Sequence, residues 1–227
     1  MNRLLLLVAS LILVSTANLT GIALLAKPES PEAGLNITVH VYNYARIPAY
    51  TLTRTEKQVA DYFFRAGIQL QWEDCTLSPP KAGSSSSPCP WDPDPSDLVL
   101  KIVPHLDVKA EGFRGDVFGM AAASQIIIIN ERTEEIARMA EATYPVVLGI
   151  TIAHELGHAL LGPNSHSKDG IMCPSWVGKD FKRVQSTTLS FTPEQAEEMH
   201  LTIQQRKTFK QRARRCPRRS QSMTKCY

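Results

Sequence analysis

The chain has 227 residues, of which 43% are hydrophobic and 21% charged, and this balance argues against a disordered or collagen-like protein. Its length fits one globular domain with a sizeable core. The formal net charge of +3 is unevenly distributed, because residues 206–227 hold nine Lys or Arg and no acidic residue. No apolar run beyond residue 27 approaches the roughly 18 residues that a membrane span needs, which argues against a transporter or channel.

The N-terminus has the composition of an export signal. A charged start precedes an apolar run over 4–14, and small residues follow it. This pattern predicts a signal peptide cleaved before Asn18. Because apolar residues resume over 19–26, the whole stretch 1–26 could instead remain as an N-terminal membrane anchor. In both cases we expect an exported protein, either secreted or periplasmic.

Hydrophobic periodicity predicts a sheet with helices packed on it. The strongest strand patterns cover residues 36–42, 68–72, 97–103 and 125–129. A helix is predicted over 53–65, with Gly67 as its stop signal. The Gly- and Ala-rich stretch 112–124 contains a short additional strand near 118–121. The predicted fold class is therefore α/β, in the α+β sense, with a twisted mixed sheet of four to five strands.

Two further helices are predicted in the second half of the chain. The first covers 146–161, with Pro145 at its start and Gly162–Pro163 at its end. It is apolar almost all round, so we expect it to be buried. The second begins at Thr192, the predicted N-cap, and runs to about Arg206.

Five cysteines in an exported chain are first of all disulfide candidates. Cys75 and Cys89 bracket a Pro- and Ser-rich segment without apolar periodicity, so a bridge between them would staple a loop that cannot order itself. Cys216 and Cys226 could close the basic C-terminal segment in the same way. Cys173 falls outside both pairs, and we interpret it as an inert thiol, with a redox or inhibitory role as the alternative.

The predicted helix 146–161 carries two histidines four positions apart. His154 and His158 lie on one face of it, about 5 to 6 Å apart at Cβ, so both imidazoles can bind one cation. Glu155 lies on the same turn and can act beside a metal-bound water without being a ligand. The two histidines could instead be hydrogen-bonded core residues, but a buried carboxylate between them would then be costly.

A catalytic zinc site needs a third protein ligand. His166 is the best choice, because Gly162–Pro163 ends the helix and lets the chain turn back towards the metal. Asp169 is the nearby acidic alternative. No Glu occurs between Glu155 and Glu194, which removes the downstream-Glu arrangement of thermolysin-like enzymes. The other histidines are isolated, and we interpret them as structural or surface residues: His40, His105 and His200.

These residues resemble the metzincin zinc endopeptidases, and most of all their matrixin-like members. HELGH stands at 154–158, Gly162 follows, His166 is the third histidine, and Met172 is in the position of the methionine turn beneath the metal. The sequence LLGPNSHSKDGIM, at 160–172, also resembles predicted secreted bacterial HExxH peptidases. The resemblance spans about residues 35–206, and it implies a metzincin-like catalytic domain with a long active-site helix and a C-terminal helix.

The resemblance implies an exported zinc-dependent endopeptidase with one catalytic Zn²⁺. His154, His158 and His166 would bind the ion, and Glu155 would be the general base that activates the zinc-bound water for hydrolysis of a peptide bond. The partner would be a protein or peptide substrate, and we expect a monomer. The resemblance also implies an edge strand that pairs with an extended substrate and contains Gly119, Met120 and Ala121. Pro174 and Trp176 would form a wall of the specificity pocket. Trp176 has an alternative place in the core.

Two features depart from the family pattern. His166 follows His158 by eight residues instead of six, and Asn164 occupies the expected register, so the loop must be wider or the ligand must differ. We retain His166, because an amide is a poor zinc ligand beside an available imidazole. Cys173 stands where several relatives carry Tyr, so a tyrosine that assists catalysis is not evident.

The basic tail, predicted as residues 207–227, is interpreted as a solvated end, with weak contact to an anionic surface as the alternative. No interleaved aromatic residues accompany it, so we expect no specific nucleic-acid binding. Two other functions remain open: a metal-binding but catalytically idle surface protein, and an interaction module that acts through the tail. Glu155 favours the peptidase, since an idle site needs no carboxylate there.

Overall fold

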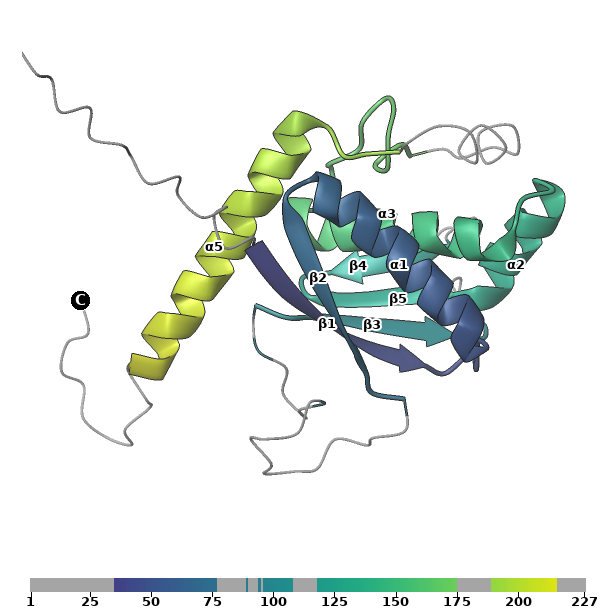
Figure 1. Cartoon of the computed structure of the whole chain (residues 1–227), viewed down its shortest axis with the longest axis horizontal. Helices are drawn as coiled ribbons and strands as arrows, with labels where there is room; N and C mark the ends of the chain where they lie inside the picture. The colour runs from purple at the N-terminus through teal and green to yellow at the C-terminus, as the bar shows by residue number, and fades with distance from the viewer. Residues whose placement is uncertain are drawn as a thin grey trace, which may run out of the picture. The chain divides into compact units, whose positions relative to one another are not determined.

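The computed structural model describes residues 35–76, 89, 94, 96–107, 118–174 and 189–215. They form a five-stranded mixed sheet with helices packed on it, which confirms the predicted fold class (Figure 1). The strands are β1 (Leu35–Asn43), β2 (Ile68–Asp74), β3 (Leu98–Val103), β4 (Gly119–Ala122) and β5 (Gln125–Ile129). The helices are α1 (Ala49–Arg65), α2 (Asn130–Met139), α3 (Tyr144–Leu161) and α5 (Pro193–Arg215).

The strand order is β2-β1-β3-β5-β4, and β4 alone among these strands is antiparallel to its neighbour. The two-residue turn between β4 and β5 contains Ala123 at a φ of 54°. In the register of this hairpin Gly119 lies opposite Ile128. Within the described ranges, β4 ends the strand order and is an edge strand, as the family resemblance implied.

One face of the sheet, here called the helical face, carries α1 and α3 (Figure 1). Alternate residues of β1, Ile37, Val39 and Val41, point into this core together with the apolar side of α1. Burial of alternate residues on a strand is the cause of the period-two pattern in the sequence. Helix α3 is apolar enough to cross a membrane by composition alone, but 67% of it is buried inside the fold, so it is a core helix.

The opposite face, here called the disulfide face, holds a small cluster of Tyr42, Val99, Cys75 and Cys89. Cys75 and Cys89 form the disulfide that the Pro- and Ser-rich loop suggested. Beside it the buried His40 places Nε2 3.2 Å from Oδ2 of Asp97 and Nδ1 3.8 Å from Sγ of Cys75.

Three helices differ from their predicted bounds, and a fourth was not predicted. Helix α3 begins at Tyr144 instead of residue 146. Helix α1 begins at Ala49 instead of residue 53. Helix α2 was not predicted, because five of its ten residues are charged. Apart from its first residue, Asn130, only Thr133 and Ala137 are buried, so the helix has no clear apolar periodicity. Helix α5 continues to Arg215 instead of ending near Arg206, so the first part of the predicted tail is helical. Gly and Pro are absent from 194–215, so neither residue interrupts the helix over this range.

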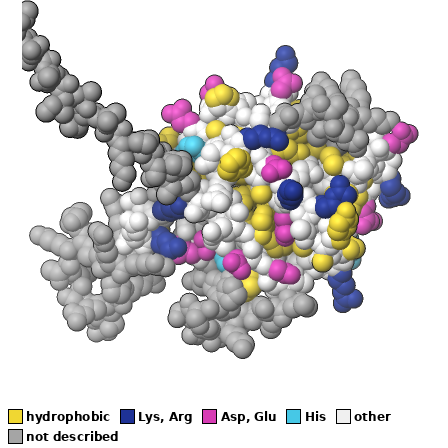
Figure 2. Space-filling model, viewed as in Figure 1, with side chains coloured by type: hydrophobic (Ala, Val, Ile, Leu, Met, Phe, Trp, Pro, Cys, Tyr) yellow, Lys and Arg dark blue, Asp and Glu magenta, His cyan; other side chains and the backbone are white. Residues whose placement is uncertain are grey.

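The segment 1–26, the cysteines Cys216 and Cys226, and Trp176 lie outside the described residues. The other predicted structural histidines are placed. His200 is half-buried with Nε2 2.6 Å from the carbonyl of Ala66, and His105 is exposed. On the face of the molecule in Figure 2, acidic and basic side chains are interspersed.

Candidate metal centre

The three predicted histidine ligands converge. Helix α3 supplies His154 and His158, and Gly162, at a φ of 91°, ends the helix and lets the chain return. The Nε2 atom of His158 lies 3.0 Å from Nε2 of His154 and 3.1 Å from Nε2 of His166. Among the described residues these three side chains form the one group of this kind that could hold a metal ion.

Hydrogen bonds at the Nδ1 atoms fix the orientation of two of the three imidazole rings. Nδ1 of His154 lies 2.9 Å from the carbonyl oxygen of Ile171, and Nδ1 of His158 lies 3.0 Å from that of Gly162. A carbonyl only accepts, so both Nδ1 atoms carry the proton and both Nε2 atoms present lone pairs. Lone pairs 3.0 Å apart repel unless a cation lies between them, so this donor set fits a metal ion with imidazole ligands.

The surroundings favour neutral imidazoles. Burial, together with the neighbouring His158 and His166, lowers the pKa of His154 to about 4 against the opposing effect of its bond to Ile171. Partial burial and His158 also lower the pKa of the exposed His166. Metal binding requires deprotonated ligands, so little proton release is needed at neutral pH.

Glu155 lies beside this cluster and is only 9% exposed. Burial raises the pKa of its carboxyl to about 7, whereas a dication nearby would favour the carboxylate. The side chain fits because strand β4 passes it at Gly119, where a Cβ atom would lie 2.8 Å from Cγ of Glu155. The carboxyl is therefore held between α3 and the edge strand.

The predicted methionine turn lies against α3. Met172 is fully buried, and its sulfur approaches Gly157 so closely that a Cβ there would lie 2.4 Å away. Gly170, at a φ of 88°, makes the turn and passes the carbonyl of Ser190. Ser167 donates its backbone N–H to the carbonyl of Met172 at 2.9 Å. The turn therefore supports both the helix and the segment that carries the third histidine.

The wider loop between the second and third histidines brings His166 to the cluster. Asp169 is exposed and does not belong to the group that could hold a metal, and Asn164 is exposed as well. Ser165 donates its hydroxyl to the carbonyl of Gly162 at 2.7 Å. The loop thus folds back on the end of α3, which accommodates its two additional residues.

The residues predicted to bind substrate are only partly brought together. Gly119 touches Glu155, and Met120 and Ala121 continue along the edge strand half-buried. Pro174 follows the methionine turn and is exposed. Trp176, the other predicted wall residue, is outside the described part of the chain.

Three residues that support the site were not predicted from the sequence, namely Gly157, Ser165 and Gln195. Gln195 donates from Nε2 to the carbonyl of Ser165 at 3.0 Å. A signal for it existed, because Thr192 and Gln195 have the spacing of a capping box. No sequence signal indicated that this box would also touch the histidine loop.

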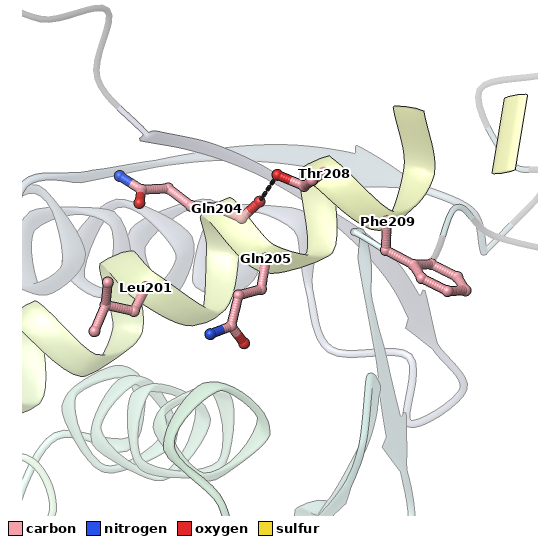
Figure 3. Close-up of a pocket in the computed structure, with 5 residues that line it drawn as sticks. All are labelled: Leu201, Gln204, Gln205, Thr208 and Phe209. Atoms are coloured by element: carbon pink, nitrogen blue, oxygen red, sulfur yellow. Dashed lines mark hydrogen bonds between the residues drawn. The ribbon is translucent and has the colours of Figure 1, made fainter. Parts of the chain in front are cut away.

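A surface hollow lies elsewhere, along α5 (Figure 3). Five side chains of this one helix line it, and none is a predicted site residue: Leu201, Gln204, Gln205, Thr208 and Phe209. This hollow therefore contains none of the converging side chains that define the functional centre.

No family model matches the sequence, and no curated protein sequence is significantly similar to it. Among solved structures, the chain is similar to an archaemetzincin from Methanopyrus kandleri, with 18% identity and a TM-score of 0.47 over 76% of this chain and 98% of the other. It is also similar to a zinc-dependent peptidase from Methanocorpusculum labreanum, with 13% identity and a TM-score of 0.48 over 71% and 99% of the two chains. These values are too low to assign a family.

Proposed function

We propose that the chain is an exported, zinc-dependent endopeptidase of the metzincin type. The observation that carries this proposal is the convergence of three imidazole Nε2 atoms beside one buried carboxyl group. Zinc is the metal that best suits these three histidines. Catalytic zinc sites commonly use three protein ligands, which can all be histidines, and keep the fourth position for water. The HELGH motif and the buried Met172 support the metzincin type.

The roles of the residues follow from their chemistry. The three histidines would hold the zinc ion, which would supply a Lewis acid for the peptide carbonyl and would lower the pKa of a bound water towards about 7. Glu155 takes a proton from the attacking water and delivers it to the leaving amine. The carbonyls of Ile171 and Gly162 hold two of the imidazoles in the orientation that this requires.

The proposed substrate is an extended polypeptide that pairs with the edge strand β4. The contact between Gly119 and Glu155 supports this position, since a chain lying along β4 would pass the carboxyl. We expect Ala121→Pro, which removes a backbone N–H, to raise KM more than it lowers kcat. Ala121→Ser keeps the N–H and is the matched control; an unchanged KM in the proline variant would exclude β4 as the substrate strand.

Export is proposed from the apolar N-terminal run, and the Cys75–Cys89 disulfide supports it because such bonds persist in oxidising compartments. Determination of the N-terminal residue of the exported protein separates the two forms of the proposal. A new terminus at Asn18 indicates a cleaved signal peptide, whereas an intact terminus in the membrane fraction indicates an anchor.

The test combines metal analysis with cleavage of an unfolded protein. We expect about one zinc per wild-type chain, weaker binding in His166→Ala, and zinc-loaded Glu155→Gln with activity reduced about 10²- to 10⁴-fold. Zinc binding without cleavage in the wild type would favour the idle metal-binding protein. Absence of zinc binding would overturn the proposal.

A further inference from the structure

The first turn of α5 is hydrogen-bonded to the loop that carries the third histidine. Gln195 donates from Nε2 to the backbone carbonyl of Ser165 at 3.0 Å, and Ser165 directly precedes His166. Gln195 is only 9% exposed, so water competes weakly for this bond. The contact joins segments that are 30 residues apart in the sequence.

The other end of the same amide is also occupied. Oε1 of Gln195 accepts the backbone N–H of Thr192 at 3.0 Å, and the backbone N–H of Gln195 donates to the Thr192 hydroxyl at 3.2 Å. This reciprocal pair is a capping box. Rotation of the amide by half a turn would place its NH₂ against an N–H and its oxygen against a carbonyl. One orientation of one side chain therefore satisfies both the helix and the loop.

The position of the His166 ring depends on its backbone more than the positions of the other two rings do. Their Nδ1 atoms are held by carbonyls, whereas Nδ1 of His166 has no hydrogen-bond partner within the described ranges, and the ring is exposed. The loop is also two residues longer than the family pattern that the motif resembles. A longer, exposed loop loses more conformational entropy when it is fixed.

We infer that Gln195 is a positioning residue of the metal centre, which fixes the backbone before His166 and thereby couples docking of the first turn of α5 to metal binding. This inference rests on the proposed function only in taking His166 as a zinc ligand. Gln195 touches neither the metal nor the substrate. By thermodynamic linkage, if α5 strengthens metal binding, metal binding stabilises the first turn of α5 by the same free energy.

The decisive variant is Gln195→Glu. A glutamate still accepts the N–H of Thr192 and keeps the capping box, but it cannot donate to Ser165. We expect zinc affinity, measured by competition with a chromogenic chelator, to fall about tenfold, as for other residues that orient a ligand. The added negative charge would by itself attract the cation, so weaker binding cannot come from charge.

Two matched controls separate positioning from general loss of structure. Thr192→Ala removes the hydroxyl acceptor of the capping box and leaves the bond between Gln195 and Ser165. Gln204→Glu makes the same change of charge on an exposed position of α5. We expect both variants to bind zinc with wild-type affinity, although Thr192→Ala lowers the melting temperature.

Hydrogen exchange tests the reciprocal effect. Zinc should slow exchange of the amides of Gln195 and Ala196 in the wild type and much less in Gln195→Glu. If wild-type chain binds zinc and Gln195→Glu binds it equally well, the inference is wrong while the proposed function stands. The inference is also wrong if Thr192→Ala weakens zinc binding as much as Gln195→Glu does. If the wild type binds no zinc, both fail.

Discussion

The helical face and the disulfide face of the same sheet are held by different interactions. On the helical face, α1 and α3 bury a continuous apolar core that includes Val39 and Leu148. On the disulfide face the described residues contribute four members to the apolar cluster. Polar or covalent links accompany it: the Cys75–Cys89 bond, His40 with Asp97, and Lys210 with Asp94 at 2.8 Å.

This difference shows where each kind of stabilisation is needed. Regular helices can cover a sheet by burying periodic apolar side chains. The segment after β2 has no such periodicity, so a disulfide near the end of β2 compensates for a weak core. The metal centre lies on the side with the large core, where rigid packing around α3 can hold the histidines in place.

Removal of the disulfide should have the largest effect on stability. We expect the double variant Cys75→Ala and Cys89→Ala to lose about 3 kcal/mol of unfolding free energy, as for a closed loop of this length. Urea denaturation measures the loss, and reductant should destabilise only the wild type. Zinc affinity should stay unchanged because the histidines lie on the other side; a parallel loss of zinc would show that the two faces are not independent.

The same substitution on the two faces compares their cores directly. Val39→Ala opens a cavity in the large core, and Val99→Ala opens one in the small cluster. We expect losses of about 2–3 kcal/mol for Val39→Ala and about 1–2 kcal/mol for Val99→Ala, because the small cluster can relax more easily. Equal losses in thermal denaturation would mean that the cores do not differ in rigidity.

Alanine substitutions at two glycines of α3 compare the packing near the histidines with the packing elsewhere on the helical face. A Cβ at Gly157 would collide with the buried Met172, so Gly157→Ala should cost about 1–3 kcal/mol. At Gly149 the nearest atoms belong to the flexible end of Gln58, at 3.0 Å, and the helix gains from alanine. We therefore expect Gly149→Ala to be within about 1 kcal/mol of the wild type. Melting temperatures of both variants test this difference.

The smallest expected effect concerns Glu56 of α1, whose pKa is raised from 4.5 to about 7 by burial and by Asp74. The folded state then holds this proton more tightly than the unfolded state, so stability falls as pH rises from 4.5 towards 7. Glu56→Gln should remove this loss and flatten the pH profile, by at most about 1 kcal/mol at a partly exposed site. An unchanged slope between wild type and variant would contradict the assignment.

The strands and α3 could be predicted because their patterns reflect burial directly. Ile37, Val39 and Val41 alternate since one side of β1 faces the core, and α3 is apolar because it is surrounded. Helix α2 carries few apolar residues, and the extension of α5 beyond Arg206 carries a charge excess that resembles a solvated tail. In the extension of α5 no Gly or Pro interrupts the helix, and the ion pair between Lys210 and Asp94 adds a tertiary contact to it.

Two of the three donors and the carboxyl beside them follow from the sequence, because His154 and His158 at helical spacing with Glu155 between them can be recognised from local geometry alone. The packing of the whole chain brings the predicted His166 to these donors across a longer loop, leaves room for the carboxyl at Gly119, and lets Gln195 support the third histidine. Spacing along a helix is fixed by 3.6 residues per turn, whereas contacts between distant segments depend on how the whole chain packs.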